Sequence, residues 1–301
     1  MRAAGVVRMP SGRRSVCQVT SPGSEALDLL ERVAAHGVRL EPLGRGSGGE
    51  IGATLVRWPD GREGVLKSIT HRSFSEVQRT ADVLEMARGH GLPVPLYERV
   101  LDLGGSVAIV QERLPGTPPL VVDRGLLEAL VALNERFAGL LADRLDVPAP
   151  RLYLQESGPG YCLHESLAGY DRRSRRLLSW IREVGRDSPA VVAGADLVHP
   201  DLHPGNALVD GYRLCGLVDW DELARGDRRF ALVVLRFNAG WEGWDAALIS
   251  WLDALLAEVL DPESFRIYWA HKSLAAVDWA IRRHTRQDVE RRLAVAESHL
   301  S

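Results

Sequence analysis

One short segment concentrates the side chains whose types and spacing could do chemistry. Residues 197–222 read LVHPDLHPGNALVDGYRLCGLVDWDE and place Asp201, Asn206 and Asp219 on a tight turn and a following hairpin. An amide and a carboxylate that converge from two segments form an oxygen-rich site suited to Mg²⁺. The other carboxylate, Asp201, is free to orient a hydroxyl group and accept its proton.

The basic residues carry a second signal, because they are almost all arginine. Of the 37 Lys and Arg residues, only Lys67 and Lys272 are lysine. A lysine that persists in such a chain marks a position that needs a compact point charge rather than a planar fork. Lys67 lies in the apolar stretch GVLK, downstream of a glycine-rich turn, and both features suit the oxygens of a phosphate.

The elements that must position these residues divide near residue 115. Apolar stretches at 40–43, 50–58 and 62–69 predict a three-stranded antiparallel meander with a glycine-rich first turn. A helix is expected over 73–88. Beyond a Pro/Gly-rich segment the pattern is helical, and the expected helices span about 124–145, 164–184, 227–239, 244–260, 262–284 and 286–299. Asp261 with Pro262, and Thr285 with Asp288, carry the signals of helix starts.

At this point the chain resembles the aminoglycoside phosphotransferase family, a branch of the protein-kinase-like fold. HPDLHPGN followed by LVDWD is similar to the family pattern His-Gly-Asp-x-x-x-x-Asn with a later Asp-Trp pair. The resemblance implies an α+β, bilobal fold with a small antiparallel-sheet N-lobe and a larger, mostly helical C-lobe. The expected N-lobe spans 24–115, the interlobe hinge 111–116 and the C-lobe 116–301. Such a protein moves the γ-phosphoryl group of ATP or GTP to a small-molecule hydroxyl.

The resemblance also assigns roles to individual positions. Asp201 would be the catalytic base, Asn206 and Asp219 would hold magnesium, and His199 and Asp227 would support the catalytic loop. In the implied nucleotide site, Lys67 would bind the α/β-phosphates, with Glu76 beside it. The nucleotide would be covered by Gly44, Gly46 and Gly48. The hinge would contribute Gln111, Glu112 and Leu114. Positioning and charge neutralisation carry such a mechanism.

The chain departs from the family pattern at two places. Pro200 stands where the family has glycine, and proline restricts its own φ and the conformation of His199. The helix glutamate that should pair with Lys67 has no exact counterpart. Glu76 is the closest choice and Glu85 the second.

Trp241, Glu242 and Asp245 follow the expected magnesium site, where the resemblance places an acceptor pocket. Residues 240–301 hold ten acidic residues against seven Lys and Arg. Carboxylates attract a cationic acceptor, so we expect an aminoglycoside or a related basic antibiotic, a cyclic peptide included, with resistance as the result. A macrolide or a metabolic alcohol such as homoserine or a choline-like compound is the alternative acceptor.

Two other classes of function are compatible with parts of the pattern. His199, Asp201 and His203 could form the metal cluster of a hydrolase, but no third histidine lies nearby at a ligand-like spacing. The chain could also be a nucleotide-binding pseudokinase, although the lysine, both aspartates and the asparagine are all present.

Composition bounds the remaining possibilities. The chain has 301 residues with a formal net charge of −3, which argues against coating nucleic acid or an anionic membrane. Three scattered cysteines exclude a disulfide framework and fit a reducing cytoplasm. No apolar run reaches membrane-spanning length. We expect residues 1–23 to form a disordered tail and the protein to be a cytoplasmic monomer or homodimer.

Overall fold

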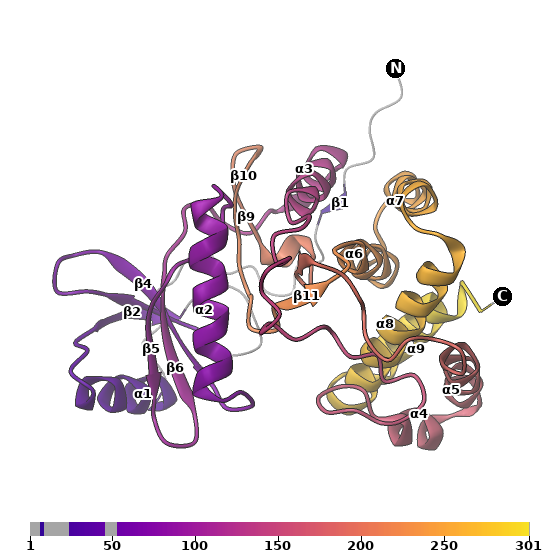
Figure 1. Ribbon diagram of the computed structural model, residues 1–301, viewed down its shortest axis with the longest axis horizontal. Coiled ribbons are helices and arrows are strands. Elements are labelled where there is room, and N and C mark those ends of the chain that lie inside the picture. The colour runs from indigo at the N-terminus through magenta and orange to yellow at the C-terminus, as the bar shows by residue number, and fades with distance from the viewer. Residues whose placement is uncertain (1–6, 9–23, 46–52, 301) are drawn as a thin grey trace. The chain divides into compact units, whose positions relative to one another are not determined.

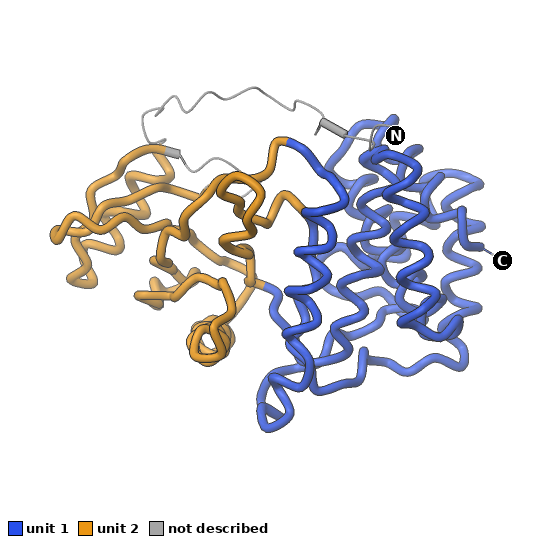
Figure 2. Tube along the Cα trace, turned by 90° about the horizontal axis from the view of Figure 1, so that it is seen from above, with its two compact units in different colours: residues 1–8, 121–203, 222–301 blue, residues 9–120, 204–221 orange. Residues whose placement is uncertain are grey.

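The computed structural model describes residues 7–8, 24–45 and 53–300, which form two compact units. Residues 9–120 and 204–221 make the sheet unit, and residues 1–8, 121–203 and 222–301 make the helical unit (Figure 2). The boundary at 120/121 lies beyond the expected position near 115. The segment 204–221 also differs from the expected division, because it belongs with the sheet unit.

The sheet unit is built on a five-stranded antiparallel sheet (Figure 1). Its strands, in spatial order, are β2 (Glu41–Arg45), β3 (Thr54–Arg57), β4 (Glu63–Ile69), β6 (Val107–Glu112) and β5 (Tyr97–Asp102). β2, β3 and β4 pair in sequence order, which confirms the expected meander. β4 pairs with β6 so that Lys67 lies opposite Ile109.

Two helices complete the hydrophobic core of this unit. α1 (Ser24–Ala35) buries Leu29 and Val33 in a cluster with Val56, Leu66 and Val110 of the sheet. α2 (Phe74–Gly89) buries Val77, Val83 and Leu84. Burial of these apolar side chains supplies most of the stabilisation of such a layer, and it holds β4 rigidly in the middle of the sheet.

A hairpin from the later part of the chain joins the sheet unit. β9 (Ala207–Asp210) and β10 (Arg213–Leu217) pair in antiparallel fashion, after a single 3₁₀ turn at Pro204–Asn206. Thr117 and Val209 exchange two backbone hydrogen bonds of 3.0 and 2.8 Å, and the Leu217 amide donates to the Pro93 carbonyl at 2.9 Å. Gly116, at φ 93°, allows this approach, because a Cβ there would lie 2.8 Å from the Val209 carbonyl oxygen.

The helical unit contains the remaining helices and two small strand pairs. The helices are α3 (Arg124–Glu135), α4 (His164–Tyr170), α5 (Arg172–Gly185), α6 (Arg229–Glu242), α7 (Ala246–Val259), α8 (Pro262–Arg283) and α9 (Arg286–Glu297). β8 (Asp196–Val198) pairs with β11 (Ala224–Gly226), and β7 (Val121–Val122) with β1 (Val7–Arg8), both antiparallel.

The helix boundaries follow local capping chemistry. Asp261 caps α8 with Pro262 at its start, and Thr285 forms a capping box with Asp288, as expected. The expected helix over 164–184 is two helices, because Asp171 is extended and its carboxylate caps α5 through the Ser174 amide. The expected helix over 124–145 ends at Glu135.

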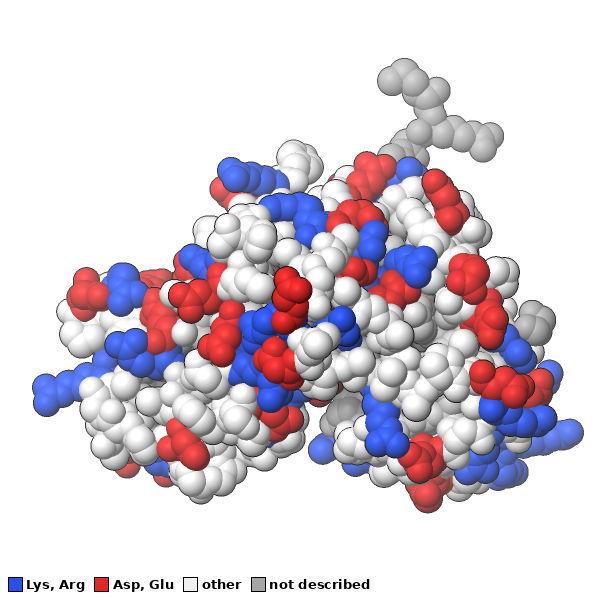
Figure 3. All heavy atoms as spheres, in the orientation of Figure 1, with Lys and Arg blue, Asp and Glu red and all other residues white. Residues whose placement is uncertain are grey.

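The expected disordered tail of residues 1–23 falls mostly outside the described residues. Val7–Arg8 is the described part, and it forms the strand that pairs with β7. Among the described residues, every helix is too short or too polar to cross a lipid bilayer. Acidic and basic side chains are interspersed over the face shown in Figure 3, which agrees with a formal net charge near zero.

Candidate active site

Lys67 and Asp219 form an ion pair within the sheet unit. The Lys67 Nζ lies 3.0 Å from the Asp219 Oδ1, and the two side chains are 16% and 44% exposed. Lys67 projects from the central strand β4, and Asp219 follows β10, 152 residues later. An ammonium and a half-exposed carboxylate held together in this way give the unit a charged site that is open to a ligand.

The hairpin brings Asn206 to the same place. Ala207 pairs with Leu217 at the open end of the β9–β10 ladder, and the Val218 amide donates to the Asn206 carbonyl at 2.9 Å. Asn206 precedes the first strand and Asp219 follows the second, so the antiparallel pairing sets the two residues side by side. The sequence separation of 13 residues expected from the family pattern corresponds to this hairpin.

The backbone of Asp219 is strained. At φ 68° it has positive φ, and among the described residues every other positive φ belongs to glycine. Aspartate tolerates this left-handed region better than most residues but still adopts it at a cost. Strain of this kind persists where the surroundings over-determine the conformation and is common at functional sites.

Two neighbours of Asp219 hold it in that conformation. Trp220 is 1% exposed, and its indole Nε1 donates to the Leu217 carbonyl at 2.8 Å. The Tyr97 hydroxyl, from β5, donates to the Asp221 carboxylate at 3.2 Å. Burial and the Asp221 charge raise the pKa of Tyr97 well above its usual value, so it stays a donor. Sequence reasoning did not identify Tyr97, which lies more than 120 residues from its partner.

The donor set at Asn206 and Asp219 fits magnesium. Mg²⁺ is commonly bound by one or two protein oxygens together with water and the phosphates of a substrate, and the backbone pairing here sets a residue with an amide side chain next to the segment that carries a carboxylate. The described residues hold no cluster of three or more His, Cys, Asp or Glu side chains arranged for a metal ion.

The expected hinge residues lie at the end of β6. Gln111 and Leu114 are buried at 4% and 9% exposure. Glu112 pairs with Arg88 of α2 at 2.6 Å, so its side chain joins the sheet to the helix. Gly44 lies at a β-bulge in β2 with φ 140°. Gly46 and Gly48 are outside the described residues, so their expected position over the nucleotide remains a prediction.

Glu76 binds Ser73 and not the expected partner, Lys67. Its carboxylate accepts hydrogen bonds from the Ser73 amide at 2.8 Å and the Ser73 hydroxyl at 2.7 Å, completing a capping box at the start of α2. These bonds lower the pKa of Glu76. Within the described residues, Lys67 pairs with Asp219 and with neither Glu76 nor Glu85. We therefore assign Glu76 to the helix cap in this structure.

Asp201 belongs to the helical unit, where it follows β8. Its side chain is 55% exposed, so a substrate can reach the carboxylate. The buried His199 accepts a hydrogen bond from the Asp201 amide on Nδ1 at 3.3 Å. His203 Nε2 lies 3.4 Å from Asp201 Oδ2. His199 therefore holds the backbone of the loop, and His203 holds the Asp201 carboxylate.

The charges around Asp201 favour its ionised form. Loss of solvent alone would raise the pKa of Asp201, but the hydrogen bond with His203 and the positive charge of Lys272 hold it well below its usual value. Burial alone would lower the pKa of His203, but the bond to Asp201 raises it. Asp201 is therefore ionised across the physiological pH range, and its carboxylate pairs with the His203 imidazole.

Asp227 follows β11, the strand that pairs with β8 ahead of the loop that carries Asp201. Its carboxylate binds Arg229 at 2.8 Å and accepts a hydrogen bond from the Tyr268 hydroxyl at 3.0 Å. A close backbone approach holds the same region, because a Cβ on Gly194 would lie 2.2 Å from the Gly226 carbonyl oxygen. The expectation that Asp227 supports the loop from behind remains a proposal.

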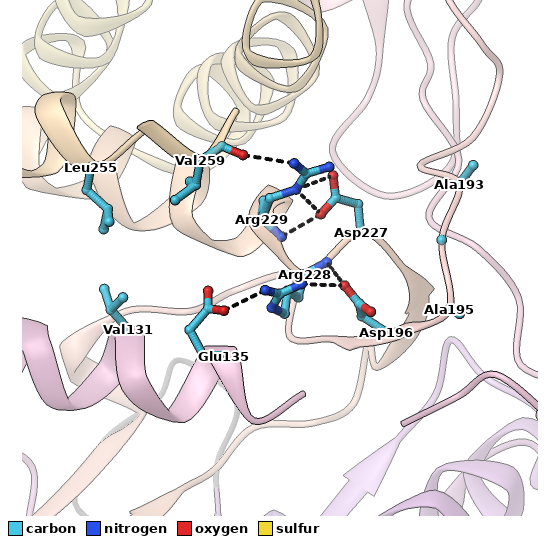
Figure 4. Close-up of a pocket in the computed structure, with 11 residues that line it drawn as sticks. Val131, Glu135, Ala193, Ala195, Asp196, Asp227, Arg228, Arg229, Leu255 and Val259 are labelled. Atoms are coloured by element: carbon cyan, nitrogen blue, oxygen red, sulfur yellow. Dashed lines mark hydrogen bonds and ion pairs between the residues drawn. The ribbon is translucent and has the colours of Figure 1, made fainter. Parts of the chain in front are cut away.

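A cavity of about 460 Å³ lies beside Asp227 (Figure 4). Glu135, Asp196, Arg228 and Arg229 line it, and Asp201 is not among its lining residues. Arg228 binds both Glu135 and Asp196, and Arg229 reaches the Val259 carbonyl at 2.8 Å. The charged groups of this cavity are thus paired with one another and hold α3, α6 and α7 together.

The acidic residues expected to bind the acceptor are already engaged. The Asp245 carboxylate caps α7 by accepting from the Ala247 amide at 2.8 Å. Asp253, another acidic residue of the segment after 240, binds Arg236 through two contacts of 2.6 and 3.1 Å. Glu242 accepts from the Trp244 indole at 2.8 Å, and burial raises its pKa. Glu242 also interacts electrostatically with His203 and Asp201.

Two cations that interact with Asp201 or with Glu242 were not assigned from the sequence. Lys272 of α8 interacts electrostatically with Asp201, and Arg292 of α9 interacts with Glu242. Arg292 is 1% exposed, and its guanidinium carbon lies 3.8 Å from the Trp241 ring centroid and 4.6 Å from that of Trp279. The rarity of lysine was the available signal for Lys272, but only tertiary packing shows its neighbours.

An antiparallel-sheet unit and a mostly helical unit are the two parts of a protein-kinase-like phosphotransferase fold. Comparisons with known proteins agree. The model of the phosphotransferase enzyme family, APH, matches residues 43–268, and the chain belongs to this family. No curated protein matches the chain in sequence.

Several solved structures share the fold at low sequence identity. Aminoglycoside phosphotransferase APH(4)-Ia, as a thermostable mutant with AMP-PNP and hygromycin B, has 15% identity and a TM-score of 0.66 over 91% of this chain and 98% of that one. Macrolide 2'-phosphotransferase MphH from Brachybacterium faecium has 19% identity and a TM-score of 0.53 over 89% and 97%. Amicoumacin kinase hAmiN, with AMP-PNP, Ca²⁺ and Ami, has 14% identity and a TM-score of 0.59 over 92% and 97%.

Proposed function

We propose that this phosphotransferase moves the γ-phosphoryl group of ATP or GTP to a hydroxyl of a small molecule of the antibiotic kind. The observation that carries the proposal is the pairing of Lys67 with Asp219, with Asn206 beside it. Asp201 stands five residues before Asn206 in the chain, at the position of the family's catalytic base. The similar structures act on an aminoglycoside, a macrolide and amicoumacin, so they leave the acceptor of this chain open.

In this mechanism each group has one task. Lys67 binds phosphate oxygens as a point charge. Asn206 and Asp219 would hold magnesium, which would supply neutralisation of the phosphate charge when bound. Asp201 orients the acceptor hydroxyl and accepts its proton as the oxygen bonds to the γ-phosphorus. The bond from that phosphorus to the β–γ bridging oxygen breaks, and the nucleoside diphosphate leaves with the electron pair.

A panel of antibiotics and metabolic alcohols tests the proposal, with magnesium and ATP or GTP as donor. Mass spectrometry should find one acceptor gaining a single phosphate, and omission of the acceptor should nearly stop nucleotide turnover. Turnover that needs no acceptor would favour a hydrolase. A chain that binds nucleotide but modifies nothing in the panel, and hydrolyses none, would be a pseudokinase. Resistance, as the biological result, is tested by the growth of a sensitive host that expresses the chain.

A further inference from the structure

One cavity of the helical unit has no part in the proposed phosphoryl transfer. It has a volume of about 460 Å³ and lies between α3, the N-terminal end of α6 and the C-terminal half of α7 (Figure 4). Every described residue that lines it belongs to the helical unit, and neither Asp201 nor His203 is among them. A concave space of this size is in the range that small-molecule sites occupy.

Part of the cavity wall is aliphatic. Val131 of α3 and Leu255 and Val259 of α7 line it, and each of these side chains is only half-buried. Leu255 and Val259 are one helical turn apart, so they form one apolar strip on α7. Figure 4 shows the three side chains grouped together, with the charged side chains beside them. An apolar molecule that filled this part would remove their exposed area from water, which is favourable.

The rest of the wall carries a net negative charge. Its charged residues are three acids and two arginines: Glu135, Asp196, Asp227, Arg228 and Arg229. Both carboxylate oxygens of Asp196 and both of Asp227 accept hydrogen bonds from the protein. Arg228 binds two of the acids, and Arg229 binds the third together with a backbone carbonyl. The acids therefore outnumber the cations by one, and both cations are already engaged.

Glu135 is the acid that can accept a further hydrogen bond. Its side chain is 48% exposed, and its Oε2 lies 2.5 Å from the Arg228 Nη2. Among the described residues no donor binds the other oxygen, Oε1, and Figure 4 shows that oxygen turned away from Arg228. An ionised carboxylate accepts on both oxygens, so a donor on a ligand can bind Oε1 while the pair with Arg228 persists. A charged donor makes the stronger bond.

We propose that this cavity is a second small-molecule site and that its ligand is an amphipathic monocation. An ammonium group binds Oε1 of Glu135, and a short aliphatic body packs against Val131, Leu255 and Val259. One positive charge brings the charges of the wall into balance, whereas an anion would meet three carboxylates. The proposal goes beyond the proposed function and does not depend on it.

Three short ligands that differ in their head group test the charge of the ligand. They are n-hexylammonium, 1-hexanol and hexanoate, each added to the full chain at neutral pH and constant ionic strength. Titration with ligand-detected saturation-transfer NMR gives each dissociation constant without nucleotide or acceptor. n-Hexylammonium should bind saturably, in about the millimolar range expected of so small a ligand. It should bind about tenfold more tightly than 1-hexanol, the scale of one charge-assisted hydrogen bond, and hexanoate should bind most weakly.

Two pairs of variants locate the binding. Glu135→Gln should lower the affinity for n-hexylammonium to that for 1-hexanol. Glu128→Gln is the matched control, because Glu128 is also on α3, is 54% exposed and pairs with an arginine at 2.7 Å, but does not line the cavity. Leu255→Trp should fill the apolar part and abolish binding of both ligands. Ala257→Trp, which adds the same ring to the exposed face of α7, should leave both affinities unchanged.

The proposal fails if n-hexylammonium does not bind saturably, or if 1-hexanol or hexanoate binds equally well. It also fails if the two glutamine variants have equal effects, or if binding survives Leu255→Trp in a chain that thermal unfolding shows to be folded. If Leu255→Trp does not fold, the two glutamine variants still decide. Asp201→Asn should keep the wild-type affinity, and loss of binding there would move the ligand to the acceptor site and overturn the assignment. None of these failures would affect the proposed function, which the acceptor panel tests.

Discussion

Replacing Tyr97 by phenylalanine removes a single hydroxyl that holds the segment after β10. That hydroxyl donates to Asp221 at 3.2 Å from a side chain that is 7% exposed. The loss leaves a half-buried carboxylate without this donor, which costs about 1–2 kcal/mol of folding stability. In a chain of this size the melting temperature should fall by about 2–4 °C.

The same change should act on magnesium more than on the acceptor. Asp219 is two residues from Asp221 and is held at φ 68°, so a looser segment relaxes towards unstrained backbone. We expect the apparent KM for Mg²⁺ to rise several-fold, about 1 kcal/mol in binding, while the acceptor KM stays constant. The assay is nucleotide turnover at saturating acceptor with magnesium varied, alongside thermal unfolding.

Tyr212→Phe is the matched control for this prediction. Tyr212 lies in the turn of the β9–β10 hairpin, also in the sheet unit, and is fully exposed. Its loss should leave both the melting temperature and the magnesium KM unchanged. If Tyr97→Phe lowered stability but left the magnesium KM at the wild-type value, the idea that this bond positions Asp219 would be refuted.

Three further substitutions test the groups of the candidate site. Asp201→Asn should lower kcat by about 10²–10⁴-fold and leave nucleotide affinity nearly intact, as measured by calorimetry; near-normal turnover would contradict the base assignment. Lys67→Arg should raise the nucleotide KM and lower kcat in steady-state assays, because a planar fork replaces a point charge; wild-type kinetics would contradict the role of Lys67. The pKa of His203 is raised. As pH increases through this pKa the imidazole loses its charge and releases Asp201, so kcat/KM should rise. His203→Gln should remove this limb of the pH profile, and an unchanged profile would refute the coupling. The stability from this pair should be complete between about pH 4 and pH 6.5, be lost at higher pH as His203 loses its proton, and be lost at lower pH as Asp201 becomes protonated.

The candidate site could be predicted where chemistry is local in sequence. Asp201, Asn206 and Asp219 lie on one turn and one hairpin, and antiparallel pairing then sets Asn206 beside Asp219. Lys67 could be predicted because strand alternation and the scarcity of lysine both single it out. The caps at Asp261 and Thr285 follow from side chains within three residues of the helix start.

The remainder depends on contacts between distant segments. The attachment of 204–221 to the sheet unit rests on the Thr117–Val209 hydrogen bonds, which no local pattern encodes. The interactions of Lys272 with Asp201 and of Arg292 with Glu242 depend on the packing of helices that are distant in sequence, among them α6, α8 and α9. The acidic residues after 240 were counted as free charges, but helix capping and pairing with Arg236 engage two of them.

The local sequence signal and the family pattern predict different partners for Glu76. The spacing of Ser73 and Glu76 is the signature of a capping box, and the structure shows both of its hydrogen bonds. The family pattern instead needs a helix glutamate on Lys67. Glu76→Gln and Ser73→Ala should both destabilise the start of α2, by about 0.5–2 kcal/mol.

The two variants separate the roles because only one removes the carboxylate. If Glu76 serves the cap alone, both variants should lose stability in urea unfolding and keep the wild-type nucleotide KM. If nucleotide binding draws Glu76 to Lys67, Glu76→Gln should raise the nucleotide KM while Ser73→Ala does not, since Ser73→Ala leaves the carboxylate and weakens its hold on the cap. The second outcome would show that the ion pair between Lys67 and Asp219 exchanges for one with Glu76 when the nucleotide binds.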